Sequence, residues 1–229
     1  MKEIKYLSII SIFFIIFTFG INCASAASGN AYIHYYNEGP GYYRYPTYSD
    51  ALPHLQSMGY SVYGYNAAGA GSALSQLRNG KIFVVHNHGA PGIQYMGTNS
   101  SNSALVANPG SSSSGVPWYS VVGDLNLYTN LKIAILYGCK TGVVTSVVGD
   151  LPGAIVYKGA TAAVAWTTDT PVDGVNEWNR LFFEKAKTDN IVESFRHADY
   201  WTEVILGTPV SNPLKYYRNE KGDIYAKIN

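Results

Sequence analysis

Along this chain, short apolar runs that suit β-strands alternate with segments that have helical spacing. The runs lie at residues 31–36, 61–65, 81–85, 131–137 and 162–166. Helices are predicted at 48–58, opening at Ser49-Asp50, and at 73–78, 175–187 and 191–206. Strands interleaved with helices favour a parallel sheet that is covered by helices on both faces. The predicted fold class is therefore α/β, with a mostly parallel sheet.

Three further segments have less regular patterns. Residues 97–116 are rich in Ser, Asn and Gly, which predicts a loop and makes them the candidate lid or cleavage segment. A short helix is predicted at 118–125, where Trp118 either lines a cleft or packs in the core. The tail at 214–228 has two Tyr-rich runs around a polar centre and predicts a β-hairpin.

The N-terminus has the layout of a secretory signal peptide. Lys2 and Lys5 precede an apolar run from Tyr6 to Ile21, and Ala24-Ser25-Ala26 supplies a small-residue cleavage site. The run is about 16 residues long, short of the roughly 20 that a membrane-spanning helix needs.

We therefore expect residues 1–26 to be removed, residues 27–229 to form one domain, and the protein to be secreted or held at the cell surface. An uncleaved N-terminal anchor is the alternative. Lipid attachment at Cys23 has less support, because Gly20-Ile21-Asn22 before it lacks the usual pattern.

Charge gives no reason to expect nucleic acid or an acidic membrane as the main partner. The signal contains two lysines and one glutamate, so its removal takes the formal charge from +1 to 0. A neutral chain lacks the basic excess that such partners attract. We expect no nucleic acid, no membrane contact after signal cleavage and no cofactor, and the oligomeric state stays open.

Two of the most apolar predicted strands end on reactive side chains. Residues 81–85 lead into His86-Asn87-His88-Gly89, and residues 131–137 lead into Gly138-Cys139. Ligands of an open α/β sheet bind beyond the carboxyl ends of its parallel strands. Cys139 is the one cysteine left after signal removal, and an unpaired exported thiol is an intermolecular link, a reactive group or an inert core residue. The predicted site lies where these two strands end.

The residues at these strand ends leave alternatives open. His86 and His88 are two residues apart and face the same side of a strand, so His86 either orients the site or packs in the interior. His86, His88 and Cys139 could also be three ligands of a zinc ion. No further ligand with a recognisable spacing accompanies them, and no metal is predicted. A hydrogen-bonding role for His88 and a buried Cys139 are the structural alternatives.

Three motifs follow one another in a specific order. They are His88-Gly89 after an apolar strand, residues 133–142 around Gly138-Cys139, and residues 159–166 followed by Pro171-Val172-Asp173. Together they resemble the caspase-like cysteine peptidases of clan CD, and the pattern is most similar to CHAT and gingipain-type domains. The resemblance covers roughly residues 81–200 and implies a caspase-like three-layer sandwich.

This resemblance implies a cysteine endopeptidase in which Cys139 is the nucleophile and His88 is the general base and acid. A free thiol with a pKa of about 8.5 is only a few per cent ionised at pH 7, so a nearby imidazole helps to form the thiolate. The backbone N–H groups of Gly89 and Cys139 would stabilise the oxyanion. The implied partner is a peptide or protein substrate.

The predicted substrate-binding residues are Asp169, Asp173 and Trp166, where related enzymes build their primary specificity pocket. A desolvated carboxylate there favours Arg or Lys as the P1 residue. Asp173 could instead serve a helix N-terminus, and an apolar P1 residue is the rival preference. A function of another class also stays open: a catalytically inactive caspase-like scaffold that acts as an extracellular binding or adhesion module.

Overall fold

The computed structural model describes residues 29–36, 45–98, 103–108, 119–121, 130–169, 172–207, 213–217 and 226–229. The predicted signal peptide lies outside the described residues. None of the helices in the described part of the chain is long and apolar enough to cross a membrane.

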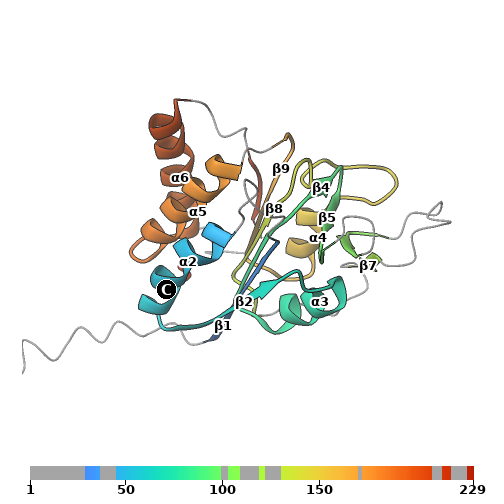
Figure 1. Cartoon of the computed structure of the whole chain (residues 1–229), viewed down its shortest axis with the longest axis horizontal. Coiled ribbons are helices and arrows are strands. Elements are labelled where there is room, and N and C mark those ends of the chain that lie inside the picture. Colours follow the sequence, from blue (N-terminus) through green and yellow to red (C-terminus); the bar gives the residue numbers. More distant parts are fainter. Residues whose placement is uncertain are drawn as a thin grey trace, which may run out of the picture.

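A six-stranded sheet runs through the middle of the fold (Figure 1). Its strand order is β10-β9-β8-β3-β1-β2, and all neighbours are parallel except β10, which is antiparallel to β9. The strands are β1 (Gly29–Tyr35), β2 (Tyr60–Asn66), β3 (Ile82–His86), β8 (Ile133–Tyr137), β9 (Ala162–Trp166) and β10 (Pro213–Tyr217). The prediction of a mostly parallel sheet is confirmed.

Helices cover both faces of this sheet (Figure 1). One face carries α2 (Tyr45–Ser57), α5 (Val172–Ala186) and α6 (Ile191–Leu206), and the other carries α3 (Ala70–Asn79) and α4 (Leu151–Tyr157). Every residue of β3, β8 and β9 is buried, because both faces of these strands are covered. In β8, Ile135 and Tyr137 pack on the α5 side while Leu136 packs on the α4 side.

A second, smaller sheet follows β3 directly. It has the order β4 (Gly89–Ala90), β5 (Ile93–Tyr95), β6 (Ala104–Val106) and β7 (Tyr119–Val121). The prediction of a loop at 97–116 is therefore wrong at 104–106, since the residues of β6 are buried in a strand. Residues 99–102 and 109–116 of this candidate lid or cleavage segment lie outside the described residues. The helix predicted at 118–125 is wrong at 119–121, where β7 pairs with β6.

Other elements also differ from the sequence predictions. The helix α2 begins at Tyr45, so Ser49-Asp50 lies inside it. The short helix α4 was not predicted, although the Asp150 carboxylate accepts a hydrogen bond from the Gly153 N–H at its start. The strand β10 pairs with β9, because an open sheet edge offers it a ladder of backbone partners. The centre of the predicted tail hairpin, residues 218–225, lies outside the described residues.

Candidate active site

The strands β3 and β8 are neighbours and bring their carboxyl ends to one edge of the sheet. His86 pairs with Tyr137 in the parallel register, and the Asn87 N–H donates to the Tyr137 carbonyl at 3.2 Å. The pairing thus continues one residue past the strand. His88 and Cys139 each follow two residues after the paired ends, so the fold brings both predicted catalytic residues to the same edge.

His88 leads into a tight hairpin formed by β4 and β5, here called the 89–95 hairpin. Its turn is Pro91-Gly92, where Gly92 has a φ of 72°, a left-handed conformation that favours glycine. The backbone of His88 is held on both sides: its N–H donates to the Asn87 side-chain oxygen at 2.7 Å, and its carbonyl accepts from the Tyr95 N–H at 3.1 Å.

Cys139 lies in the turn that ends β8, here called the 138–142 turn. The Thr141 hydroxyl is buried inside it and is 2.9 Å from the Gly138 carbonyl and 3.2 Å from the Leu136 carbonyl. The Lys140 N–H donates to the Thr168 carbonyl at 3.1 Å, and Lys140 has a φ of 60°. A left-handed conformation is uncommon for a lysine and is retained here next to the predicted nucleophile.

The 89–95 hairpin packs directly on the 138–142 turn. A methyl group at Gly89 would lie 2.6 Å from the Cys139 carbonyl oxygen and 2.8 Å from the Gly138 carbonyl carbon. The Gly92 N–H donates to the Lys140 carbonyl at 3.2 Å. The segments that follow the two predicted catalytic residues are therefore in backbone contact, with no room for a side chain between them.

Both predicted catalytic side chains are partly exposed. Cys139 is a free thiol and, like His88, is neither fully buried nor fully exposed. Within the described part of the chain, the Cys139 N–H has no acceptor. The Tyr95 N–H donates to the His88 carbonyl, so Gly89 and Gln94 form a non-hydrogen-bonded pair of the antiparallel ladder. The Gly89 N–H therefore points away from β5.

His86 packs in the interior and is only 4% exposed. Its Nδ1 lies 2.5 Å from the Thr47 hydroxyl oxygen, and that hydroxyl donates to the Asn176 side-chain oxygen at 2.9 Å. This places His86 in a network between β3, α2 and α5. Among the described residues, no three His, Cys, Asp or Glu side chains gather closely enough to hold a metal ion, so the zinc alternative gains no support.

The three predicted substrate-binding residues have different surroundings in the fold. The Asp169 carboxylate lies 3.3 Å from the Lys140 ammonium, next to Cys139. Asp173 is exposed in the first turn of α5, as its helix-terminus alternative requires. The Trp166 side chain is 0% exposed and packs against Tyr137 with ring centroids 4.8 Å apart. Its position does not support the prediction that Trp166 contacts a substrate, because the ring belongs to the core.

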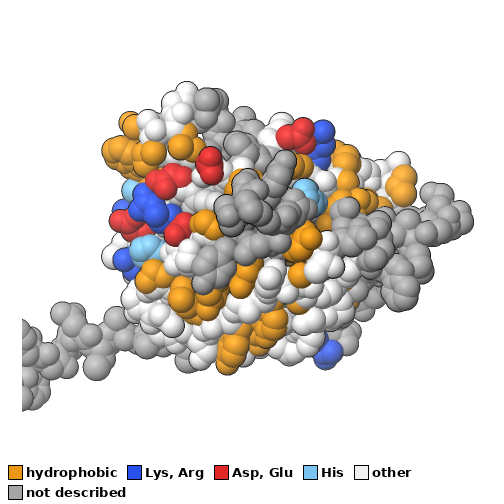
Figure 2. Space-filling model, in the orientation of Figure 1, with side chains coloured by type: hydrophobic (Ala, Val, Ile, Leu, Met, Phe, Trp, Pro, Cys, Tyr) orange, Lys and Arg blue, Asp and Glu red, His pale blue; other side chains and the backbone are white. Residues whose placement is uncertain are grey.

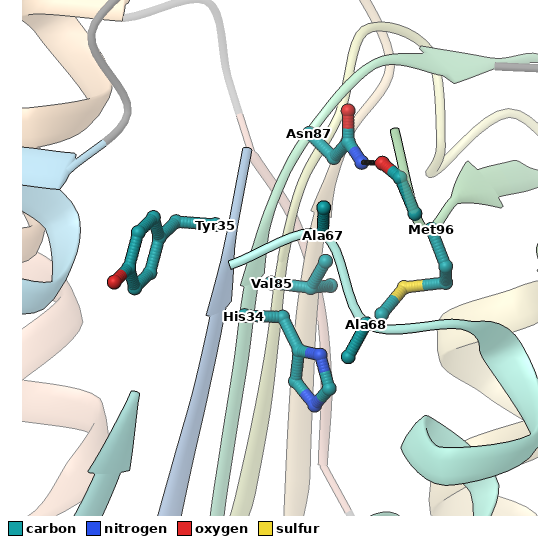
Figure 3. Close-up of a pocket in the computed structure, with 8 residues that line it drawn as sticks. His34, Tyr35, Ala67, Ala68, Val85, Asn87 and Met96 are labelled. Atoms are coloured by element: carbon teal, nitrogen blue, oxygen red, sulfur yellow. Dashed lines mark hydrogen bonds between the residues drawn. The ribbon is translucent and has the colours of Figure 1, made fainter. Parts of the chain in front are cut away.

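A shallow hollow lies on the β1 side of β3, where β1 and β3 end (Figure 3). Asn87 borders it and donates to the Gly97 carbonyl at 3.0 Å. His34, which is buried there, was not a sequence candidate. Neither His88 nor Cys139 lines the hollow, whose residues are His34, Tyr35, Ala67, Ala68, Val85, Asn87, Met96 and Gly97.

Asn87 and Gln94, which hold the backbone around His88, were not among the site residues predicted from the sequence. Asn87 lies inside the predicted motif. A short amide side chain directly before a histidine could have indicated that it binds the histidine backbone. Gln94 lies in a hairpin that was not predicted, and no pattern in the sequence marks it.

No family model matches the chain, and no curated protein matches it. Among solved structures, it is similar to the separase in a crystal structure of the Saccharomyces cerevisiae separase–securin complex, with a TM-score of 0.52 and 12% identity. The match covers 88% of this chain and 13% of the matched chain. A likeness at this identity concerns the fold alone.

Separase has the fold of the caspase-like cysteine peptidases of clan CD. The predicted α/β fold, a mostly parallel sheet with helices on both faces, is confirmed and resembles that caspase-like domain. The chain thus shares its fold with that domain.

Proposed function

We propose that this chain is an exported cysteine endopeptidase that hydrolyses peptide bonds with Cys139 as nucleophile and His88 as general base and acid. One observation carries the proposal: the 89–95 hairpin packs on the 138–142 turn at the edge where β3 and β8 end. This contact supports the proposal, because it joins the backbone segments at two partly exposed reactive residues in a fold that resembles a caspase-like domain.

The proposed chemistry has two stages. In the first, His88 accepts the thiol proton, the Cys139 sulfur attacks the scissile carbonyl carbon, and His88 returns the proton to the leaving amine as the C–N bond breaks. In the second, His88 takes a proton from water, the hydroxide attacks the thioester, and the thiol is restored as the acid leaves. The products are one carboxylic acid and one amine.

The oxyanion formed in each stage needs hydrogen-bond donors. The Cys139 N–H has no acceptor among the described residues, and the Gly89 N–H points away from β5, so both are candidates. Gly89 also lies against the backbone of the turn that carries Cys139, which supports a shared role for the two N–H groups.

The proposed P1 preference is Arg or Lys. Asp169 is the better placed of the two predicted carboxylates, because it pairs with the lysine that follows Cys139. Its side chain is 73% exposed, so a substrate cation can reach it. The likeness to CHAT and gingipain-type domains remains part of this proposal and rests on the order of the three motifs.

A peptide library tests the proposal. The purified protein is expected to cleave the library, whereas Cys139→Ala and His88→Ala lose cleavage by at least about a hundredfold. His54→Ala is the matched control, because His54 is a partly buried histidine on α2, and it should keep wild-type activity. Cleavage that survives in Cys139→Ala would rule out the proposed nucleophile.

Export is tested separately. We propose that cleavage after Ala26 leaves a mature chain that begins at Ala27, outside the cytoplasm. N-terminal sequencing of the protein recovered from the extracytoplasmic fraction checks this. A chain that retains Met1 in the membrane fraction would favour the anchor.

The alternative function is an inactive scaffold that acts as an extracellular binding module. It is favoured by large apolar side chains exposed at the end of α6, which Figure 2 shows at the upper left: Tyr200, Trp201, Val204, Ile205 and Leu206. Exposed apolar patches often mark contact surfaces. A wild-type protein that cleaves no library peptide, and whose Cys139 reacts with iodoacetamide no faster than the denatured chain, would favour this function.

A further inference from the structure

Gln94 lies under the contact between the 89–95 hairpin and the 138–142 turn, and it is completely buried. Its Nε2 donates to the His88 carbonyl at 3.2 Å and to the Tyr95 carbonyl at 3.2 Å. Its Oε1 is buried and has no hydrogen-bond partner within the described part of the chain. The orientation of the amide follows from these contacts, because carbonyl oxygens only accept hydrogen bonds.

The other edge of the Gln94 amide faces Gly138. A methyl group at Gly138 would lie 2.8 Å from Oε1 and 3.1 Å from Nε2, so the amide occupies the space that any side chain at this position would need. One side chain therefore touches the backbone of His88 and the residue directly before Cys139. No hydrogen bond links Gln94 to Gly138, and close packing alone holds this second contact.

Such an arrangement is costly for stability alone. A buried acceptor without a donor is destabilising, and a buried unsatisfied group in a folded protein needs an explanation. A methionine would fill a similar volume without this cost. The amide does one thing that methionine cannot do, which is to hold the His88 carbonyl through a hydrogen bond while it packs on Gly138.

We infer that Gln94 is a positioning residue that sets the distance between the His88 imidazole and the Cys139 thiol. The inference rests on the proposed function and extends it to a residue that touches neither the substrate nor the reacting atoms. Gln94 acts through the backbone. Its hydrogen bond to the His88 carbonyl holds the histidine, and its packing on Gly138 holds the turn that carries Cys139.

The test compares Gln94→Met with wild type in two assays. With the best library peptide, kcat is expected to fall about tenfold or more while KM stays within about twofold, because the variant misplaces the base without touching the substrate. The second-order rate of Cys139 alkylation by iodoacetamide at pH 7 should also fall, with the labelled residue identified by peptide mass spectrometry.

A double-mutant cycle separates positioning from a general loss of structure. If Gln94 acts through His88, Gln94→Met causes no further loss of alkylation rate in the His88→Ala background. An equal loss in both backgrounds, or an unchanged rate in the single variant, would overturn the inference. Gln94→Asn keeps an amide but is one methylene shorter, and it provides the same cycle if the methionine variant does not fold.

The alkylation cycle needs no substrate, so its outcome is independent of the peptidase assay. Retained cleavage in Cys139→Ala would refute the proposed function whatever the cycle shows. If cleavage depends on Cys139 but the cycle shows no coupling between Gln94 and His88, only the role of Gln94 is refuted.

Discussion

Gly89 lies against the backbone of Cys139, at a distance that leaves no space for a side chain: a methyl group at Gly89 would be 2.6 Å from the Cys139 carbonyl oxygen. The two residues are about 50 positions apart in the sequence, and parallel pairing of β3 with β8 brings them together. This contact joins the two motifs that the sequence places at separate strand ends.

Gly89→Ala is therefore expected to damage the site. The new methyl group meets backbone atoms, which cannot move aside as a flexible side chain can, and overpacking of this kind costs about 1–3 kcal/mol. Thermal unfolding should show a lower Tm, and peptide cleavage should fall. Gly71→Ala on α3 is the matched control, because nothing lies within 4 Å of the new methyl group, and it should be neutral or stabilise by up to about 1 kcal/mol. Equal Tm values for the two variants would contradict the packing argument.

Lys140 and Asp169 form an ion pair that a basic substrate side chain would have to open. Asp169→Asn should lower kcat/KM for substrates with Arg or Lys at P1 by about three- to tenfold, a modest effect because water screens an exposed pair. Lys140→Met should raise it, because the carboxylate is then unpaired. Substrates with an apolar P1 residue serve as the control. Asp173→Asn, at the start of α5, should leave kcat/KM unchanged for substrates with either a basic or an apolar P1 residue. A loss as large as that of Asp169→Asn would mean that Asp173, and not Asp169, binds the P1 side chain.

Burial lowers the pKa of His34 from its ordinary 6.5 to about 4, although the hydrogen bond with Gln76 acts in the opposite direction. The unfolded chain therefore binds a proton at His34 before the folded protein does. As the pH falls from about 6.5 to about 4, this residue should remove about 3 kcal/mol from the free energy of unfolding, with no further loss below that range. Urea unfolding at several pH values, compared with His34→Gln, measures this. An identical pH slope in the variant would show that His34 does not titrate in this way.

Thr47 connects three elements of the fold through its hydroxyl group. The hydroxyl contacts the His86 Nδ1 and donates to Asn176, and Thr47 is completely buried. Thr47→Val leaves these partners unsatisfied, so it should destabilise by about 1–3 kcal/mol. At about 2–4 °C per kcal/mol, differential scanning calorimetry resolves the change. Thr202→Val should be neutral or stabilising, because the Thr202 hydroxyl is buried without a partner among the described residues. A larger loss at Thr202 than at Thr47 would contradict the hydrogen-bond assignment.

Much of the fold could be predicted because local patterns determine it. The strand at 162–166 and the helix at 191–206 have the predicted bounds, since each is a clear apolar or amphipathic run with a turn at its end. The helix α4 was missed because its seven residues are too few to show a period. The strand β6 was missed because its three buried residues lie in a region rich in Ser and Asn.

The candidate site divides in the same way. The sequence indicates that His88 and Cys139 follow apolar strands, and the fold brings both to one edge of the sheet. The positions of Trp166 and Gln94 could not be predicted, because each depends on partners from distant segments. Trp166 packs on Tyr137 in the core, and Gln94 needs both the hairpin after β3 and the turn after β8.

By itself, the sequence determined which residues form most strands and helices and which reactive side chains follow them, because hydrophobic periodicity and turn residues act over short distances. Only the tertiary structure decided that Gly89 touches Cys139, that Lys140 pairs with Asp169 and that Gln94 lies between the two motifs. These contacts join residues that are far apart in the chain. They exist because the parallel pairing of β3 and β8 places both turns at one edge, where close packing leaves room for glycine alone.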